Sequence, residues 1–252
     1  MARVFDIIPV SMHRLPARTE TLLEDAPPLD SGQRAHLRAI RPKDGEEIEL
    51  FDGRGRARAY RYSAAAKSVI AAGTVREEAR SGADVTLFAC VTKGSRWDWT
   101  IEKSAELGIR RLVPVISERT VVRLAPGERA AKGERWRKIA EEAARQSGAM
   151  WTMEVPDAVD FPDAVVMMRG MDVFAGVIGA EPSIIGAFGS APRRPDRAYG
   201  IAIGPEGDFT DAEKAALAEV ATGVSLGKTI LRSETAAICA TGILKALLEE
   251  IT

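Results

Sequence analysis

The chain has 252 residues, 46% of them hydrophobic and 28% charged, which is typical of a globular protein whose core is stable without metal ions or disulfides. Its formal net charge of −1 excludes a chain that is basic throughout, so any electrostatic contact with nucleic acid has to be local. No apolar run approaches the roughly 18 residues of a membrane span, and the two histidines, His13 and His36, lie too far apart in sequence to indicate a histidine-rich zinc site.

The first residues and the cysteines indicate the compartment. The opening stretch MARVFDIIPV lacks the basic segment and the long apolar run of a secretory signal. Cys90 and Cys239 both stand in apolar stretches, LFACV and AAICATG, which predicts two small buried side chains in a reducing compartment. We therefore expect a cytoplasmic protein that binds no metal.

The first part of the chain, to about residue 78, is expected to be a small β-rich domain. In EEIELFDGRGRARAYRYSA, the alternating pattern around a DGRG turn indicates a β-hairpin. Nine basic residues against five acidic ones between Arg34 and Lys67 would suit contact with RNA phosphates, although a solvated face of charged strands gives the same pattern. The boundary to the next domain is expected between Arg76 and Gly82.

From ADVTLFACV onwards, apolar strands alternate with helical periodicities, which predicts an α/β domain with a largely parallel sheet. The expected strands are Val85–Val91, Arg111–Ile116, Asp172–Ile178, Tyr199–Ile203 and Val224–Leu226. The expected helices are Trp97–Leu107, Glu134–Ser147, Asp211–Ala221 and Thr235–Glu250. Thr210 and Glu213 have the spacing of a capping box, so IGPEGDF is a loop between a strand and a helix. The APRRPDR segment around Arg194 is expected to be a surface loop.

The loop IGPEGDF has the features of a small-molecule site. Gly204 and Gly207 allow backbone conformations and a close ligand approach that side chains would block. The loop also follows the carboxyl end of a strand, where open α/β sheets bind their ligands. A tight turn without any ligand would use the same glycines. Dinucleotide and P-loop sites are disfavoured, because neither GxGxxG nor GxxxxGK[ST] occurs here.

A second glycine-bearing segment, SLGKTILRSETA, follows the last of the expected strands. Beyond Gly227 it carries a polar cluster, residues 232–235, at the start of a long apolar helix. Ser233 could cap that helix, and Arg232 could form a structural ion pair with Glu234. Since the two loops each end a strand and stand about one helix apart, we expect them to converge on one ligand.

Taken together, IGPEGDFT and SLGKTILRSETA resemble the C-terminal signature of the RsmE family, the SPOUT-superfamily methyltransferases that modify N3 of a uridine in small-subunit (16S) ribosomal RNA. The match continues upstream in KGSRWDWTIEKSAELGI, PVISERT, ERWRKIAEEAARQSG and HLRAIRPKDGEEIELFDGRG, in the expected order. The resemblance therefore spans most of the chain, and its motifs are specific in combination.

The resemblance implies an α/β fold with a C-terminal SPOUT-type trefoil-knotted domain at residues 79–252 and an N-terminal PUA-like β-barrel RNA-binding domain at residues 1–78. It implies S-adenosyl-L-methionine as cofactor, ribosomal RNA or the small ribosomal subunit as partner, and a homodimer, with no role for DNA or a membrane. The cofactor is expected to contact Gly179, Ala180, Glu181, Ile203, Gly204, Glu206, Gly207, Leu226, Gly227, Ile230, Leu231, Arg232, Glu234 and Thr235.

Arg232 and Glu206 are the expected catalytic residues. Methylation of uridine N3 requires loss of the imide proton and places negative charge on the base oxygens, which a guanidinium would stabilise. Glu206 is the candidate proton acceptor, although it could equally hold its loop. The candidates for contact with RNA phosphates are Arg38, Arg41, Arg96 and Arg119.

The sequence departs from the family pattern at three places. Asp208 stands where the family usually has a second glycine, and Thr229 where it often has a basic residue. The residues 149–151, Ala-Met-Trp, stand where an arginine and soon a proline usually follow. Two other functions are compatible with the sequence: a SPOUT methyltransferase with another RNA target, such as a transfer RNA ribose 2′-hydroxyl, and a non-catalytic RNA-binding factor in ribosome assembly.

Overall fold

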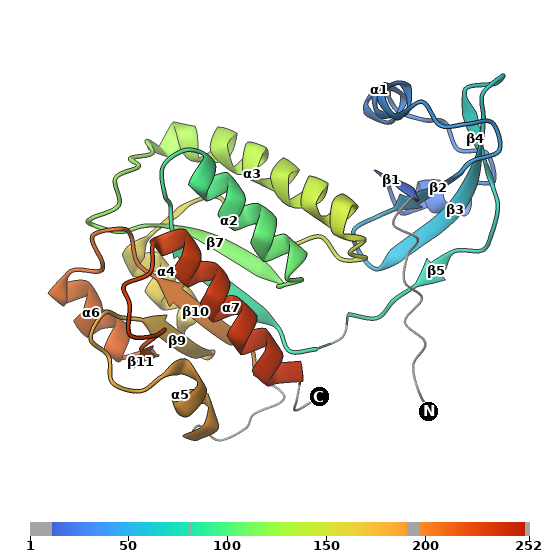
Figure 1. Ribbon diagram of the computed structural model, residues 1–252. Coiled ribbons are helices and arrows are strands. Elements are labelled where there is room, and N and C mark those ends of the chain that lie inside the picture. Colours follow the sequence, from blue (N-terminus) through green and yellow to red (C-terminus); the bar gives the residue numbers. More distant parts are fainter. Residues whose placement is uncertain (1–11, 81, 191–196, 250–252) are drawn as a thin grey trace. The chain divides into compact units, whose positions relative to one another are not determined.

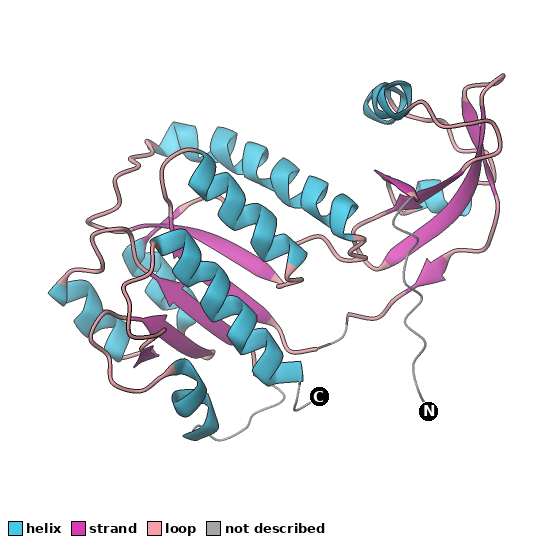
Figure 2. Ribbon diagram, viewed as in Figure 1, coloured by secondary structure: helices cyan, strands magenta, loops and turns pink. Residues whose placement is uncertain are grey.

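The computed structural model describes residues 12–80, 82–190 and 197–249. The chain divides into two compact units, one from Met1–Arg80 with Ala144–Thr152 and the other from Ser81–Ala143 with Met153–Thr252; Figures 1 and 2 show their helices and strands. The expected surface loop around Arg194 falls largely outside the described residues. No helix in the three described ranges is both long and apolar enough to cross a membrane.

The first unit contains a sheet built around the predicted hairpin. Its elements are β1 (His13–Pro16), the 3-10 helix η1 (Glu20–Leu23), α1 (Ser31–Ile40), β2 (Glu47–Phe51), β3 (Arg56–Ser63), β4 (Ser68–Ala71) and β5 (Arg76–Glu77). Strand β1 runs parallel to β2, whereas β3 pairs antiparallel with β2, β4 and β5. The hairpin is confirmed, because Phe51 lies opposite Ala57 and the turn between them places Gly53 and Gly55 at φ values of 65° and 93°, a region that favours glycine.

A buried ion pair joins β1 to β2 in this unit. The Nε atom of Arg14 donates to the Glu49 carboxylate at 2.6 Å, and both side chains are at least nine-tenths buried. Arg14 also donates to the carbonyl oxygens of Ala144 and Ala149, at 3.1 and 3.2 Å. Burial lowers the pKa of the Arg14 guanidinium, while the Glu49 carboxylate acts in the opposite direction. The ion pair thus holds the Ala144–Thr152 segment against the sheet, an attachment that the sequence did not indicate.

The second unit is the predicted α/β domain, with a six-stranded parallel sheet. Its strands are β6 (Val85–Cys90), β7 (Arg111–Ile116), β8 (Val159–Asp160), β9 (Asp172–Gly176), β10 (Tyr199–Ile203) and β11 (Ala221–Val224). They stand in the order β11-β9-β10-β6-β7-β8, and all neighbours are parallel. The strands β6 and β10 are buried along their whole length, which explains why they read as continuous apolar runs.

Helices cover both faces of this sheet. They are α2 (Ser95–Glu106), α3 (Pro126–Ser147), α4 (Phe161–Met168), α5 (Ile184–Ser190), α6 (Asp211–Ala218) and α7 (Ser233–Glu249). The side chains of α2, α3, α5 and α7 share one core with Leu87 and Ile201, whereas those of α4 and α6 share another with Phe88 and Ala202. Because neighbouring residues along a strand point to opposite faces, the sheet separates the two cores.

Several predicted boundaries in the second unit are wrong. Helix α3 begins two turns before Glu134, at Pro126, and the last strand lies at Ala221–Val224, three residues before its predicted start at Val224. Helices α4 and α5 were not predicted, because each is short and contains Pro or Gly near its ends or middle. The capping box is confirmed: the Thr210 and Glu213 side chains each accept a hydrogen bond from the other's backbone N–H.

The cysteine prediction holds for one residue and fails for the other. Cys90 is buried at the end of β6, and its burial raises the pKa of the thiol to about 12. Cys239 is exposed, because α7 turns Ala237 and Ala240 towards the sheet and leaves the intervening position 239 on the outer face.

Candidate active site

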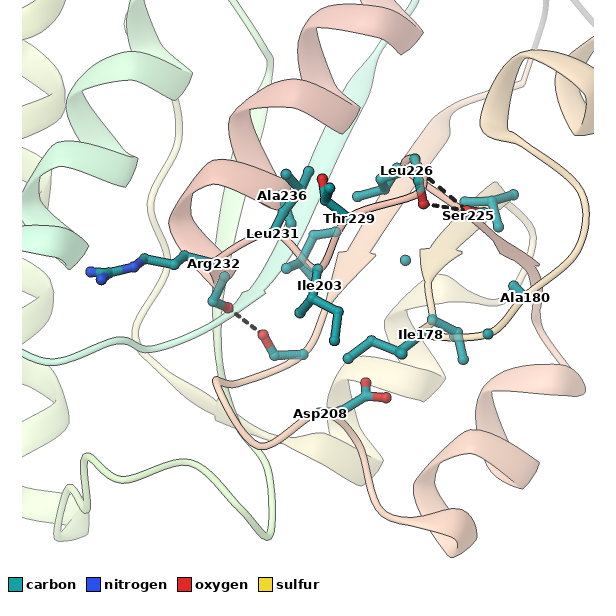
Figure 3. A pocket seen from close by; sticks show the side chains of 18 of the residues that line it. Ile178, Ala180, Ile203, Asp208, Ser225, Leu226, Thr229, Leu231, Arg232 and Ala236 are labelled. Atoms are coloured by element: carbon teal, nitrogen blue, oxygen red, sulfur yellow. Dashed lines mark hydrogen bonds between the residues drawn. The ribbon is translucent and has the colours of Figure 1, made fainter.

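Three loops at the carboxyl ends of neighbouring strands surround one cavity in the second unit, shown in Figure 3. The strands β9, β10 and β11 end side by side, because Gly176 lies opposite both Ile203 and Val224 in the sheet. The cavity has a volume of about 460 Å³, within the range of pockets that hold small molecules. Its position agrees with the expectation that the two glycine-bearing loops converge.

Glycine at position 176 makes room for the cavity wall. A Cβ atom there would lie 2.9 Å from Ile203 Cδ1 and 3.3 Å from Leu226 Cδ1, which is too close for any side chain without movement of the wall. Gly204 is packed in a similar way, since a Cβ atom would lie 3.1 Å from the ring of Phe209. The packing of the cavity wall therefore favours glycine at both positions.

The third loop, residues 225–232, is tied to the other two. The backbone N–H of Ser225 donates to the carbonyl oxygen of Pro182 at 2.8 Å, and the carbonyl oxygen of Ser225 accepts from the backbone N–H of Ile184 at 3.3 Å. The hydroxyl of Ser233 donates to the carbonyl oxygen of Gly204. Ser233 is the first residue of α7, and its hydroxyl links the two glycine-bearing loops. Because this hydroxyl bonds to Gly204 and Ser233 lies inside the helix, its predicted role as a helix cap is wrong.

Most of the residues expected to contact the cofactor line this cavity. Those on its wall are Gly179, Ala180, Ile203, Gly204, Glu206, Leu226, Gly227, Ile230, Leu231 and Arg232. The other four expected residues, Glu181, Gly207, Glu234 and Thr235, are not on the wall. The carbonyl oxygen of Gly207 instead accepts a hydrogen bond from Arg119 at 2.9 Å. Glu234 is buried, and one of its carboxylate oxygens has no hydrogen-bond partner among the described residues.

Some wall residues were missed by sequence reasoning. They are Gly176, Val177, Ile178, Pro205, Asp208, Val224, Ser225, Lys228, Thr229, Ser233 and Ala236. Most of them are immediate neighbours of predicted residues, and Ala236 stands four positions after Arg232, one turn further along α7. The alternation of β9 and this helical spacing could have identified Gly176 and Ala236.

The charged groups at the cavity differ in how they are held. Glu206 pairs with Arg96 at 3.2 Å, and Asp208 pairs with Lys214 at 2.7 Å. Arg232 is exposed, and its guanidinium extends away from Ile203 in Figure 3. Within the described ranges Arg232 forms no ion pair, so the structural pair with Glu234 that the sequence allowed is not made.

The four arginines expected at RNA lie in two groups. Arg96 and Arg119 stand in the second unit and both contact the loop at residues 206–209, Arg96 through Glu206 and Arg119 through the carbonyl oxygens of Gly207 and Phe209. Arg38 and Arg41 belong to the first unit, where they are exposed at the end of α1.

Comparison with known proteins gives a consistent result. Residues 79–245 match the RNA methyltransferase domain family. The ribosomal RNA small subunit methyltransferase E of Synechocystis sp. is 33% identical over 245 residues, which cover 95% of this chain and 79% of that protein. The protein of the same name from Bacillus subtilis is 30% identical over 234 residues, covering 88% of this chain and 91% of that protein.

Two solved structures are similar over nearly the whole chain. A methyltransferase from Legionella pneumophila, in complex with the cofactor SAM, has a TM-score of 0.82 at 26% identity and covers 94% of this chain and 98% of that one. A ribosomal RNA small subunit methyltransferase E from Neisseria gonorrhoeae, bound to S-adenosyl methionine, has a TM-score of 0.78 at 29% identity with the same coverage of 94% and 98%.

Proposed function

This chain belongs to the family of ribosomal RNA small subunit methyltransferases E, and from that premise we propose that it methylates N3 of a uridine in 16S ribosomal RNA with S-adenosylmethionine as donor. The observation that carries the proposal is the cavity at the ends of β9, β10 and β11, because ten of the predicted cofactor residues line it. Similar proteins have been solved with this cofactor bound.

The cavity suits the adenosyl group in shape and chemistry. Ile203, Leu226 and Leu231 give it apolar walls for a flat base, while the exposed backbone at Gly179 and Gly227 offers hydrogen bonds without side chains in the way. S-adenosylmethionine supplies a methyl group on a sulfonium, which makes that methyl reactive towards a nitrogen nucleophile. The chain's own contribution is then orientation of the two reactants and stabilisation of charge.

Two side chains are proposed for the chemistry. The Arg232 guanidinium is free to meet the oxygens of the uracil ring, where negative charge develops as N3 loses its proton. Glu206 would accept that proton on the carboxylate oxygen that does not face Arg96, whose guanidinium lies 3.2 Å from the other oxygen. Because the base must leave its stack to reach the methyl group, an unstacked or flipped uridine is the proposed substrate.

We extend the proposal to the architecture that the resemblance implies. Residues 1–78 are proposed as a PUA-like barrel that binds RNA, and residues 79–252 as a SPOUT domain with a trefoil knot at the cofactor loops. The hydrogen bond from Ser233 to Gly204 joins two of these cofactor loops. A homodimer acting in the cytoplasm on ribosomal RNA or the small subunit completes the proposal.

Helix α1 is the proposed RNA-binding surface of the first unit. Arg34 and Arg38 stand four residues apart on the same side of the helix, and Arg41 follows as its C-cap residue. All three are exposed, none takes part in an ion pair within the described ranges, and residues 31–41 contain no acidic side chain. Such a row of uncompensated cations suits the phosphates of a nucleic acid.

Replacing Arg38 and Arg41 together by alanine is expected to weaken binding to RNA of any sequence. The slope of log K against the logarithm of the salt concentration should become shallower by about 1.5–2, because two phosphate contacts are lost. Filter binding across a series of salt concentrations measures the slope. Arg61→Ala is the matched control, since Arg61 is also exposed in the first unit but lies 3.8 Å from Glu47. An equal slope for the double variant and this control would remove α1 from the RNA surface.

Calorimetry with S-adenosylmethionine and mass mapping of 16S ribosomal RNA test the function itself. We expect the purified protein to bind the donor, and a deletion strain to lack one N3-methyluridine that the intact gene restores. No detectable binding would point to a non-catalytic ribosome-assembly factor. Persistence of the uridine methyl, or loss of another modification such as a ribose methyl, would point to a different RNA target.

A further inference from the structure

Asp208 is an unusual residue in the cavity wall because its backbone is left-handed. Its φ is 58°, in a region that glycine adopts readily and other residues adopt rarely. Among those other residues, aspartate and asparagine are the most common there. This conformation explains why the family usually has glycine at this position. In the present chain the same backbone carries a carboxylate, which Figure 3 shows directed into the cavity near Ile178.

The carboxylate of Asp208 is held in place from the protein side. One oxygen accepts a hydrogen bond from the backbone N–H of Phe209 at 2.8 Å, and the other lies 2.7 Å from Nζ of Lys214. Lys214 stands in the first turns of α6, which the capping box of Thr210 fixes. The Asp208 side chain is only 14% exposed, so its orientation is set before any ligand arrives.

These contacts leave acceptor capacity for a ligand. An ionised carboxylate offers about four lone-pair sites, of which Phe209 and Lys214 occupy two. The walls nearby are apolar, formed by Ile178 and Ile203, so a ligand hydroxyl placed there would need this acceptor. Since Lys214 already balances the carboxylate charge, the remaining sites favour a neutral donor over a second cation.

We propose that Asp208 accepts hydrogen bonds from the ribose hydroxyls of the adenosyl group, an inference that rests on the proposed function. A pair of neighbouring hydroxyls presents two donors at the spacing of two carboxylate oxygens, and acidic side chains bind ribose in this way in dinucleotide sites. Asp208 then selects for an intact ribose. Its contribution is the same for the methyl donor and for the demethylated product, because both carry the same sugar.

Three ligands with different groups test this assignment by calorimetry. S-adenosylmethionine carries the sulfonium, the amino acid and the ribose; S-adenosylhomocysteine lacks the sulfonium charge; methylthioadenosine lacks the amino acid as well. In Asp208→Gly, which suits the positive φ and removes only the carboxylate, all three affinities are expected to fall by a similar factor, roughly tenfold or more. Asp211→Asn, an exposed acid of α6 outside the cavity wall, is the control and should leave them unchanged.

A change on the ligand side makes the test sharper. Removing the 2′- or 3′-hydroxyl of methylthioadenosine should weaken binding to the native protein but have little further effect on Asp208→Gly. Unchanged affinities in the variant, or a loss confined to the ligands that carry the amino acid or the sulfonium, would overturn the assignment while leaving the proposed function intact. If the native protein binds none of the three, the proposed function fails, and this inference fails with it.

Discussion

Replacing Glu49 by glutamine is expected to lower the free energy of unfolding by about 3–5 kcal/mol, the usual cost of removing one partner from a buried ion pair. Arg14 is 2% exposed and would keep its charge among carbonyl oxygens, with Arg76 and Arg145 as like-charged neighbours. Its guanidinium also lies 4.2 Å from the centroid of the Phe51 ring, so it cannot move into water without disturbing the core. Chemical denaturation followed by circular dichroism measures the difference.

Glu47→Gln is the matched control on the same strand. Glu47 lies 3.8 Å from Arg61, and both side chains are about half exposed or more, so this variant is expected to change stability by less than about 1 kcal/mol. Equal losses in the two variants would mean that the buried pair has no special role. A large loss of stability for Glu49→Gln alone would mean that Glu49 holds Arg14 in place. Since Arg14 donates to carbonyl oxygens of the Ala144–Thr152 segment, the pair would then also keep that segment in the first unit.

The sequence predicted those elements whose signals are local. The DGRG turn, the buried strands Arg111–Ile116 and Tyr199–Ile203, and the capping box at Thr210 all depend on a few neighbouring residues, and all are present. Helices α4 and α5 are too short for a periodic pattern to stand out. The last strand was predicted at Val224–Leu226 and lies at Ala221–Val224, because Thr222 and Gly223 read as a turn after the preceding helix and hid the start of the strand.

The unusual residues after α3 are a case in which only the tertiary structure gives the reason. Met150 is 4% exposed and packs with Phe51 and Ala57, and the indole N–H of Trp151 donates to the carbonyl oxygen of Glu78 at 3.1 Å. These residues therefore serve the packing of the first unit. A linear pattern cannot show that a segment from the middle of the α/β domain pairs with residues almost one hundred positions earlier.

The candidate site was predicted through its glycines and remained incomplete at its side chains. Gly204 and Gly227 mark loops that local chemistry can identify, and both line the cavity. Gly176 and Asp208 were missed, because one matters through contacts with distant side chains and the other through a backbone angle. The hydrogen bond from Ser233 to Gly204 joins residues 29 positions apart, which no local rule predicts.

Replacing Arg232 by alanine is expected to lower kcat for methyl transfer by about 100- to 1000-fold, the usual effect of removing one group that stabilises charge in the transition state. The fold should be unaffected, because the guanidinium is exposed and has no ion pair among the described residues. Donor affinity should change only a few-fold, since Figure 3 shows the guanidinium extending away from the wall at Ile203. Single-turnover transfer of a labelled methyl group to 16S ribosomal RNA, with calorimetry of donor binding, measures both.

Two further variants separate catalysis from general electrostatics. Lys228→Ala removes another exposed cation from the same cavity wall and should cost less than about tenfold in kcat, because a lysine lacks the planar fork that meets two oxygens together. Arg232→Lys should recover part of the lost rate for the same reason, since it restores the charge without the fork. Unchanged turnover in Arg232→Ala would exclude the residue from the chemistry. A parallel loss of donor affinity would instead mean that Arg232 binds the carboxylate of S-adenosylmethionine, because an interaction equally strong in the ground state and the transition state does not raise kcat.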